Sequence, residues 1–237
     1  MLKVTLINHT PEPEKTVAAA ARLCYSQTGA AELWENLTPD KVDRFIAKLV
    51  EMGHLSPTEH VSFTFAIEGV SRTLSHQLVR HRIASYSQKS QRYVAEDGFQ
   101  FVVPPAIKAD PAAFRIFTET METLRESYRQ LASMVPKEDA RYVLPNSCET
   151  KLVATFNCRS LFNFFRLRCC QRAQWEIREL AEKMLAEVRS VAPRLFTYAG
   201  PSCAVEGICY EGQMSCGRAP VLQDVVNSYK KKDRGVE

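Results

Sequence analysis

The chain has 237 residues, of which 45% are hydrophobic and 24% charged, and its formal net charge is +4. This composition is ordinary for a globular protein, so it excludes disorder as the main state, and the mild net charge does not by itself indicate a nucleic-acid binder. No run of about 18 or more apolar residues occurs, and the first residues lack the length and cleavage pattern of a signal peptide. We therefore expect a cytoplasmic protein without membrane contact.

Hydrophobic periodicity predicts an ordered series of strands and helices. In chain order these are a strand at residues 3–7, helices at 13–24 and 39–53, a strand at 61–67, a helix at 73–82, a strand at 99–103, a helix from 111 through 131, a strand at 152–156, and helices at 160–168 and 174–191. Thr38-Pro39 and Asp110-Pro111 are typical helix starts, and Gly53 is a typical helix end.

Strands and helices do not alternate strictly, which predicts an α+β fold rather than a doubly wound α/β fold. We expect a mixed or antiparallel sheet flanked by long helices. No linker rich in Pro, Gly or Ser divides the chain, so we predict one domain over residues 1–217, with a Cys-rich segment at 200–217 and a C-terminal tail at 218–237. Within that tail, Lys230–Arg234 is expected to be frayed.

Acidic residues are missing from two separate segments. Gly69–Ala95 and Thr150–Trp175 contain no Asp or Glu, and Arg outnumbers Lys in both. Two solvated helix faces are the simpler explanation of such runs. We favour a site for an anionic ligand, because a local positive potential attracts anions and the planar guanidinium suits phosphate oxygens.

The eight cysteines are expected to be mostly reduced thiols. Cys203, Cys209 and Cys216 lie in a Gly-rich segment, where Cys169 or Cys170 could complete a structural zinc site. Their spacing is wider than the tight Cys-x-x-Cys pattern, so packed or redox-active thiols remain the favoured interpretation.

The glycines exclude two common phosphate-binding loops. Neither a G-x-G-x-x-G nor a G-x-x-x-x-G-K-[ST] pattern occurs, so a Rossmann loop and a P-loop are both absent. Any phosphate must therefore be held by arginines and helix N-termini.

The polar run from Gln77 to Tyr93 is the strongest candidate for chemistry. Arg72, His76 and Arg80 are spaced for one helical face. We expect a polar loop to follow, with hydrogen-bonding groups from Ser85, Ser87, Gln88, Ser90, Gln91 and Arg92. Such groups suit a phosphate together with the edge of a heterocycle, although an exposed amphipathic helix with a polar turn is the simpler alternative.

Arg80-His81-Arg82, followed by seven residues and Ser90, resembles the RHRx7S signature of flavin-dependent thymidylate synthases. Residues 53–65, 140–145, 157–168 and 173–178 are similar to further motifs of that family, in the same order. The ordered similarity runs from about residue 17 to about residue 200. It implies an α+β enzyme that makes dTMP from dUMP, with 5,10-methylenetetrahydrofolate as carbon donor, reduced FAD as hydride donor and NADPH as the reductant of the flavin. It also implies a homotetramer with active sites between subunits, and no nucleic-acid partner.

The resemblance carries over to individual residues. It assigns dUMP binding to Gln77, Arg80, Gln88, Ser90, Gln91, Arg92, Arg141 and Arg168. It assigns FAD contacts to His54, Ser56, Arg80, His81, Arg82, Gln88, Asn157, Arg159 and Asn163, with a weaker assignment for Arg172. Arg168 is the expected catalytic residue, because a fixed cation there polarises the uracil ring by favouring ionised N3. No metal is assigned. Many family members have Asn and Glu where this chain has Ser87 and Gln88, so only a hydrogen-bonding role is expected at position 88.

Three alternatives to this interpretation involve other residues or another class of function. Ser90 could be a nucleophile with His81 as its base, but no acid in the segment orients the histidine. A covalent mechanism at Cys148 is rejected because the cysteine lacks the Pro-Cys-His context of the flavin-free thymidylate synthases. A single-strand nucleic-acid module could use the two basic segments with stacking side chains from Tyr86, Tyr93, Phe162 and Phe165.

Overall fold

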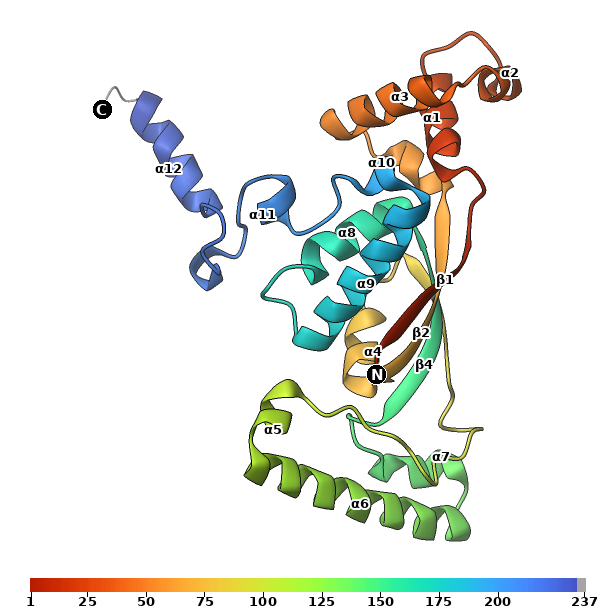
Figure 1. The fold of residues 1–237 in the computed structure, drawn as a ribbon, viewed down its shortest axis with the longest axis vertical. Helices are drawn as coiled ribbons and strands as arrows, with labels where there is room; N and C mark the ends of the chain where they lie inside the picture. Colours follow the sequence, from red (N-terminus) through yellow and green to blue (C-terminus); the bar gives the residue numbers. More distant parts are fainter. Residues whose placement is uncertain (234–237) are drawn as a thin grey trace. The chain divides into compact units, whose positions relative to one another are not determined.

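The computed structural model describes residues 1–233, with side chains described through residue 227. Within that range, four strands form one sheet in the order β1-β2-β4-β3 (Figure 1). Their bounds are β1 Lys3–His9, β2 Ser62–Ser71, β3 Ala84–Gln88 and β4 Glu149–Asn157. Strands β2 and β4 are antiparallel, because the pairing of Val61 with Cys158 at one end is followed by the pairing of Arg72 with Cys148 at the other.

The chain forms two compact units, each made of separate stretches of sequence. Unit 1 contains residues 1–5 and 65–154, and unit 2 contains residues 6–64 and the chain from 155 onward. Strands β1, β2 and β4 each contribute residues to both units. The predicted single domain over residues 1–217 stays a prediction.

Unit 1 is built around the long helix α6, Pro111–Met134. Asp110 starts this helix, because its Oδ1 accepts hydrogen bonds from the N–H groups of Ala112 (2.8 Å) and Ala113 (3.1 Å). The other helices of the unit are α4 Arg72–Leu78, α5 Pro105–Ala109, α7 Lys137–Ala140 and the 3-10 turn η2 Arg141–Val143. Helices α5 and α7 pack against α6, and Met121 on α6 joins Phe99 and Cys148 in a buried apolar cluster (Figure 1).

Unit 2 holds most of the remaining helices. Their bounds are α1 Pro13–Leu23, α2 Ala30–Glu35, α3 Pro39–Glu51, η1 Ser56–His60, α8 Cys158–Arg168, α9 Trp175–Val191, α10 Pro193–Phe196, α11 Ser202–Val205, η3 Gly212–Met214 and α12 Leu222–Asp233. Helix α1 packs against α2, α3 and η1, and α8 packs against α9 and η1. In the core of this unit the buried ring of Phe196 contacts the buried rings of Phe63 and Phe165. None of the described helices is long and apolar enough to span a membrane.

Most predicted elements are confirmed, including the α+β combination of an antiparallel pair of strands with long helices. Residues 99–103 were predicted as a strand, but they contribute only a single bridge from Phe101 to Cys148. The prolines at 104 and 105 follow immediately, and proline has no N–H with which to continue a ladder.

Two boundaries around the polar run were also wrong. The helix predicted to Arg82 ends at Leu78, so Arg80 does not share a helical face with Arg72 and His76. Residues 84–88, predicted as loop, form the edge strand β3. An edge strand is solvated, so its serines do not prevent pairing. At the C-terminus the expected fraying is not seen through Asp233, which ends α12, and Arg234 lies outside the described residues.

Candidate active site

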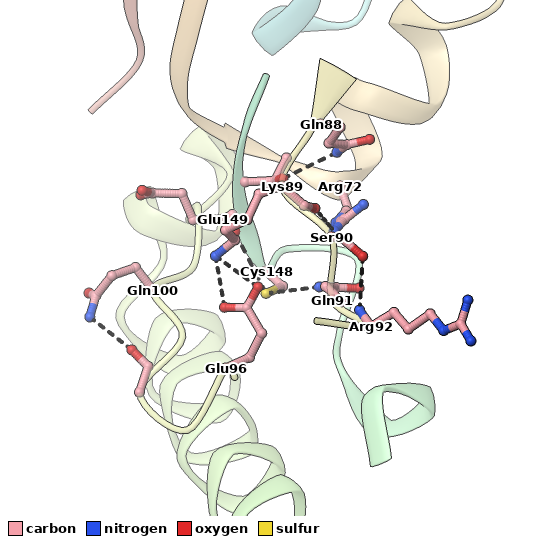
Figure 2. A network of polar contacts seen from close by, with 12 residues as sticks. Arg72, Gln88, Lys89, Ser90, Gln91, Arg92, Glu96, Gln100, Cys148 and Glu149 are labelled. Carbon is pink, nitrogen blue, oxygen red and sulfur yellow. Dashed lines mark hydrogen bonds and ion pairs between the residues drawn. The ribbon is translucent and has the colours of Figure 1, made fainter. Parts of the chain in front are cut away.

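A tight turn begins at Ser90, directly after the edge strand β3. The backbone N–H of Lys89 donates to a β4 carbonyl (3.0 Å), which extends the pairing of the two strands by one residue. Ser90 then accepts two hydrogen bonds, one at Oγ from the Arg92 N–H (3.2 Å) and one at its carbonyl from the Val94 N–H (3.0 Å). The sheet edge therefore fixes where this turn starts, and the turn holds Ser90 and Arg92 next to each other (Figure 2).

Arg92 and Arg141 both contact Glu138 of unit 1. The Arg92 Nε lies 2.6 Å from the Glu138 carboxylate, and the Arg141 Nε donates to the Glu138 carbonyl (3.1 Å). Two of the predicted dUMP-binding arginines are thus brought together although 49 positions of sequence separate them. Because Arg92 and Glu138 are both half-exposed, their ion pair is weak and an incoming anion can replace it at small cost.

Gln88 and Gln91 both turn toward the start of β4. The Gln88 Nε2 donates to the Thr150 Oγ1 (3.2 Å), and the Gln91 Nε2 donates to the Cys148 sulfur (3.6 Å). Figure 2 shows Gln91 directed at Cys148, whereas the Arg92 side chain points away from it. Gln88 is therefore held in place by a hydrogen bond to the neighbouring strand.

Tyr86 on β3 holds the Arg80–Arg82 turn through its side-chain hydroxyl. The Tyr86 hydroxyl donates to the carbonyls of Leu78 and His81, each at 2.9 Å. Burial raises the pKa of Tyr86, so the hydroxyl stays protonated and remains a donor. Gln77 lies in the last turn of α4, half-buried, and the arginines of the following turn are exposed. The structure therefore places the signature motif on a turn after the helix.

In unit 2, three predicted FAD contacts line one pocket of about 370 Å³, a volume within the roughly 300–1,000 Å³ range of small-molecule sites. They are His54, Ser56 and Arg159, and apolar walls come from Leu49, Leu55 and Pro57. Gly53 adopts a left-handed conformation (φ 67°), and the N–H of His54 donates back to the Leu49 carbonyl (3.0 Å). This helix end directs the chain after α3 toward the pocket.

Two further predicted FAD contacts in unit 2, Asn157 and Asn163, lie at the N-cap and in the middle of helix α8. The Asn157 Oδ1 caps the helix by accepting from the Ser160 N–H (2.8 Å), and Arg159 forms an ion pair with Glu59 (2.5 Å). Asn163 is exposed four residues after Arg159, on the same helical face. A helix N-terminus with an arginine, beside a pocket with apolar walls, fits a flavin nucleotide, because it offers donors to phosphate and a surface for a ring.

Arg168 belongs to unit 2, where it is the last residue of α8 and half-buried. The other predicted dUMP residues all belong to unit 1, as do Arg80–Arg82 and Gln88 among the predicted FAD contacts. Within unit 1 the structure joins Ser90 and Arg92 in one turn, and it brings Arg92 and Arg141 to the same residue, Glu138. Within unit 2 it gathers the residues of the pocket and of the α8 N-terminus.

Three residues behind the Ser90 turn, Arg72, Lys89 and Glu96, had no site role assigned from the sequence. Arg72 donates to the Lys89 carbonyl (2.9 Å), and the Lys89 ammonium lies 2.8 Å from the carboxylate of buried Glu96. The absence of acids from this stretch of sequence draws attention to Arg72 and Lys89, but no sequence signal pairs Lys89 with Glu96.

Comparison with known proteins supports the same interpretation. Residues 5–194 match the family model described as thymidylate synthase complementing protein. The flavin-dependent thymidylate synthases of Clostridium tetani and Geobacter sulfurreducens are each 54% identical, over 94% and 92% of this chain and 96% and 95% of theirs. The chain belongs to the flavin-dependent thymidylate synthase family. The resemblance seen in the RHRx7S motif is thereby confirmed, and the chain is an enzyme of the methyltransferase type.

A solved structure of a flavin-dependent thymidylate synthase relative adds a ligand-bound example. The UMP/dUMP methylase PolB from Streptomyces cacaoi, bound with 5-Br dUMP, aligns with a TM-score of 0.73 at 28% identity. The alignment covers 83% of this chain and 93% of that one. This chain therefore shares its fold with that methylase.

The cysteines of this flavin-dependent thymidylate synthase do not form the considered zinc site. Among the described residues, no group of three His, Cys, Asp or Glu side chains is close enough to hold a metal. The wide spacing of the three cysteines places them in different local structures, with Cys203 in α11, Cys209 in a bridge to Val221 and Cys216 after η3. Burial raises the pKa of Cys148 to about 11, so its thiol stays protonated and is a poor nucleophile.

The structure also bears on the nucleic-acid alternative, which requires four aromatic side chains for base stacking. Phe165 has no exposed area and packs against Phe164 and Phe196. Tyr86 is half-buried and uses its hydroxyl beneath the signature turn. Two of the four proposed aromatic side chains are therefore committed to packing, which disfavours base stacking on this surface.

Proposed function

We propose that the chain methylates dUMP to dTMP, taking the carbon from 5,10-methylenetetrahydrofolate and the hydride from FAD that NADPH has reduced. Family membership supports the use of a flavin, and the 5-Br dUMP complex of the PolB relative supports a uridine nucleotide as substrate. The observation that carries the proposal is that Ser90 and Arg92 share one turn of unit 1, and that Arg92 and Arg141 both contact Glu138. These groups match the donors that a nucleotide phosphate requires.

In this proposal the phosphate of dUMP takes the place of the Glu138 carboxylate on Arg92. Arg141 lies at the same glutamate and adds a second guanidinium. The Ser90 hydroxyl donates to a phosphate oxygen, while Gln88 and Gln91 remain available for hydrogen bonds to the nucleoside. Gln77 and Arg80 are assigned to dUMP by resemblance.

Arg168 is proposed to lie against the uracil ring. A guanidinium at that place favours the form of uracil ionised at N3, and it stabilises negative charge that develops in the ring during reaction. The residue carries its charge at every working pH, so it needs no proton transfer to act.

His54, Ser56, Asn157, Arg159 and Asn163 are proposed to hold FAD together with the Arg80–Arg82 turn and Gln88. When bound, FAD supplies the hydride. The protein contributes donors to its phosphates and apolar walls that exclude water from its ring. We further propose a homotetramer with active sites between subunits, as the family resemblance implies.

The test is dUMP-dependent oxidation of NADPH by purified protein with added FAD and methylenetetrahydrofolate, followed by chromatographic detection of dTMP. UMP is run in parallel, because the structural relative is named for both nucleotides. We expect dTMP to form only when all four components are present. Visible absorption of bound flavin is measured on the same preparation. Flavin binding without any methylated nucleotide would contradict the proposed reaction.

A further inference from the structure

An ion pair with a buried carboxylate and a largely buried ammonium group lies directly behind the Ser90 turn. The Lys89 Nζ is 2.8 Å from both carboxylate oxygens of Glu96, and Glu96 is only 4% exposed. Burying two charges costs free energy, and apolar side chains of similar size often stabilise a protein as well as such a pair does. A buried pair at this place is therefore better explained by the position it enforces than by stability alone.

Glu96 is itself held in place by helix α6. Arg125 and Arg129 donate to backbone carbonyls of the segment 96–99 (2.7 and 2.9 Å), and the Tyr128 hydroxyl accepts an N–H from the same segment (3.1 Å). Tyr128 and Arg129 follow Arg125 by three and four positions, so both lie on the same side of the helix as Arg125. The long helix thus fixes the carboxylate that the Lys89 ammonium contacts.

Arg72 holds Lys89 from the other side. The Arg72 Nη2 donates to the Lys89 carbonyl (2.9 Å), and its own backbone N–H donates to the Cys148 carbonyl (3.1 Å), at the start of β4. Among the described residues, the buried Nε of Arg72 has no hydrogen-bond partner. Lys89 is therefore restrained at its N–H by β4, at its carbonyl by Arg72 and at its ammonium by Glu96 (Figure 2).

We propose that Arg72 and the buried Lys89–Glu96 ion pair are positioning groups that fix Lys89, and through it the Ser90–Arg92 turn, for the phosphate of dUMP. This inference rests on the proposed function, because it takes dUMP as the ligand of that turn. Neither Arg72 nor Glu96 is placed in contact with substrate. Both act through the backbone of the residue that precedes Ser90.

The test compares dUMP with deoxyuridine, which lacks the phosphate, on FAD-saturated protein. Arg72→Gln removes the charged donor to the Lys89 carbonyl, and Glu96→Gln removes the charge that holds the Lys89 ammonium. A charge-assisted hydrogen bond is worth about 10-fold to 100-fold in an equilibrium constant, so we expect either variant to weaken dUMP binding by about that factor. Deoxyuridine affinity and FAD affinity, both measured by titration, are expected to stay near the wild-type values.

A matched control separates positioning from loss of stability. Glu14 in unit 2 is also buried, and it accepts from the Arg194 guanidinium (2.9 Å). Glu14→Gln should lower the melting temperature as Glu96→Gln does, but leave the ratio of dUMP to deoxyuridine affinity unchanged. Arg72→Lys keeps the charge and can still donate to the carbonyl, so it should recover much of the dUMP affinity that Arg72→Gln loses.

Two results would overturn the inference. One is a folded Arg72→Gln or Glu96→Gln protein with the wild-type ratio of dUMP to deoxyuridine affinity. The other is an equal loss for both ligands, which indicates general damage to the unit. If Glu96→Gln fails to fold, the half-buried Arg72 carries the test through its two variants. Wild-type protein that binds deoxyuridine and dUMP equally would instead contradict the proposed phosphate site, and this inference with it.

Discussion

The Arg92 Nε lies 2.6 Å from the Glu138 carboxylate, and both side chains remain about half exposed, at 54% and 45%. Arg92 is a predicted dUMP ligand, so in the proposed binding mode Glu138 and the nucleotide compete for one guanidinium. An exposed pair of this kind is worth about 0.2–1 kcal/mol, and salt weakens it further. The Glu138 carboxylate therefore restrains the Arg92 guanidinium only weakly.

Replacing Glu138 should therefore strengthen dUMP binding. We expect Glu138→Gln to lower the Kd for dUMP by about 1.5-fold to 5-fold at low ionic strength, because the competing charge is gone. The gain should shrink as salt is raised to about 0.5 M, where charges are screened over a few ångströms. Glu179→Gln, which breaks an exposed pair with Lys183 on α9, is the control. Weaker dUMP binding by Glu138→Gln would show that Glu138 orients Arg92 rather than competing for it.

Arg168→Ala should reduce turnover with little effect on folding. Loss of one preorganised charge at the reacting ring is expected to lower kcat by roughly 100-fold or more with dUMP saturating. Arg166→Ala is the matched control, because Arg166 lies two residues earlier on α8 and pairs with Glu206 (3.6 Å). Its kcat should change only a few-fold. A kcat for Arg168→Ala close to the parent value would remove Arg168 from the catalytic role.

Tyr86→Phe should loosen the Arg80–Arg82 turn. Its hydroxyl bonds to two carbonyls, and the loss of such bonds is expected to lower the free energy of unfolding by about 0.5–1.5 kcal/mol. The Kd for FAD should rise as well, since His81 and its neighbours are proposed FAD contacts. Urea unfolding and flavin titration measure the two effects. Tyr93→Phe, at an exposed position, should change neither, and equal effects of both variants would contradict the role of Tyr86.

Stability should fall as pH rises above about 9, in part through Cys148. Burial, and then the charge of Glu96, raise the pKa of this thiol from near 9 to about 11. Between pH 9 and pH 11 the unfolded chain has released the thiol proton, whereas the folded protein keeps it. Rising pH therefore favours unfolding, and one group lowers the free energy of unfolding by at most about 1.4 kcal/mol per pH unit. The contribution is fully present below pH 9 and is lost toward pH 11. Urea unfolding at pH 7, 9 and 10 should show a shallower decline for Cys148→Ala, and parallel declines would exclude Cys148 as a contributor.

The sequence by itself determined the family, most helices and the residue types of the site. Its periodicity marks α6 and α9 because their apolar residues recur at helical spacing, and Asp110 marks the start of α6 by local hydrogen-bonding chemistry. These features depend only on residues within a few positions of one another, so the sequence alone reveals them. The RHRx7S motif likewise identifies the family because its residues lie close together in the sequence.

Only the tertiary structure decided which distant groups meet. The edge strand β3 was missed because its pairing with β4 depends on residues some 60 positions away. For the same reason no local pattern reveals that Glu96 receives the Lys89 ammonium, or that Arg92 and Arg141 share Glu138. Ion pairs and edge-strand hydrogen bonds form between groups brought close by the fold, and charge and polarity along the chain do not encode that proximity.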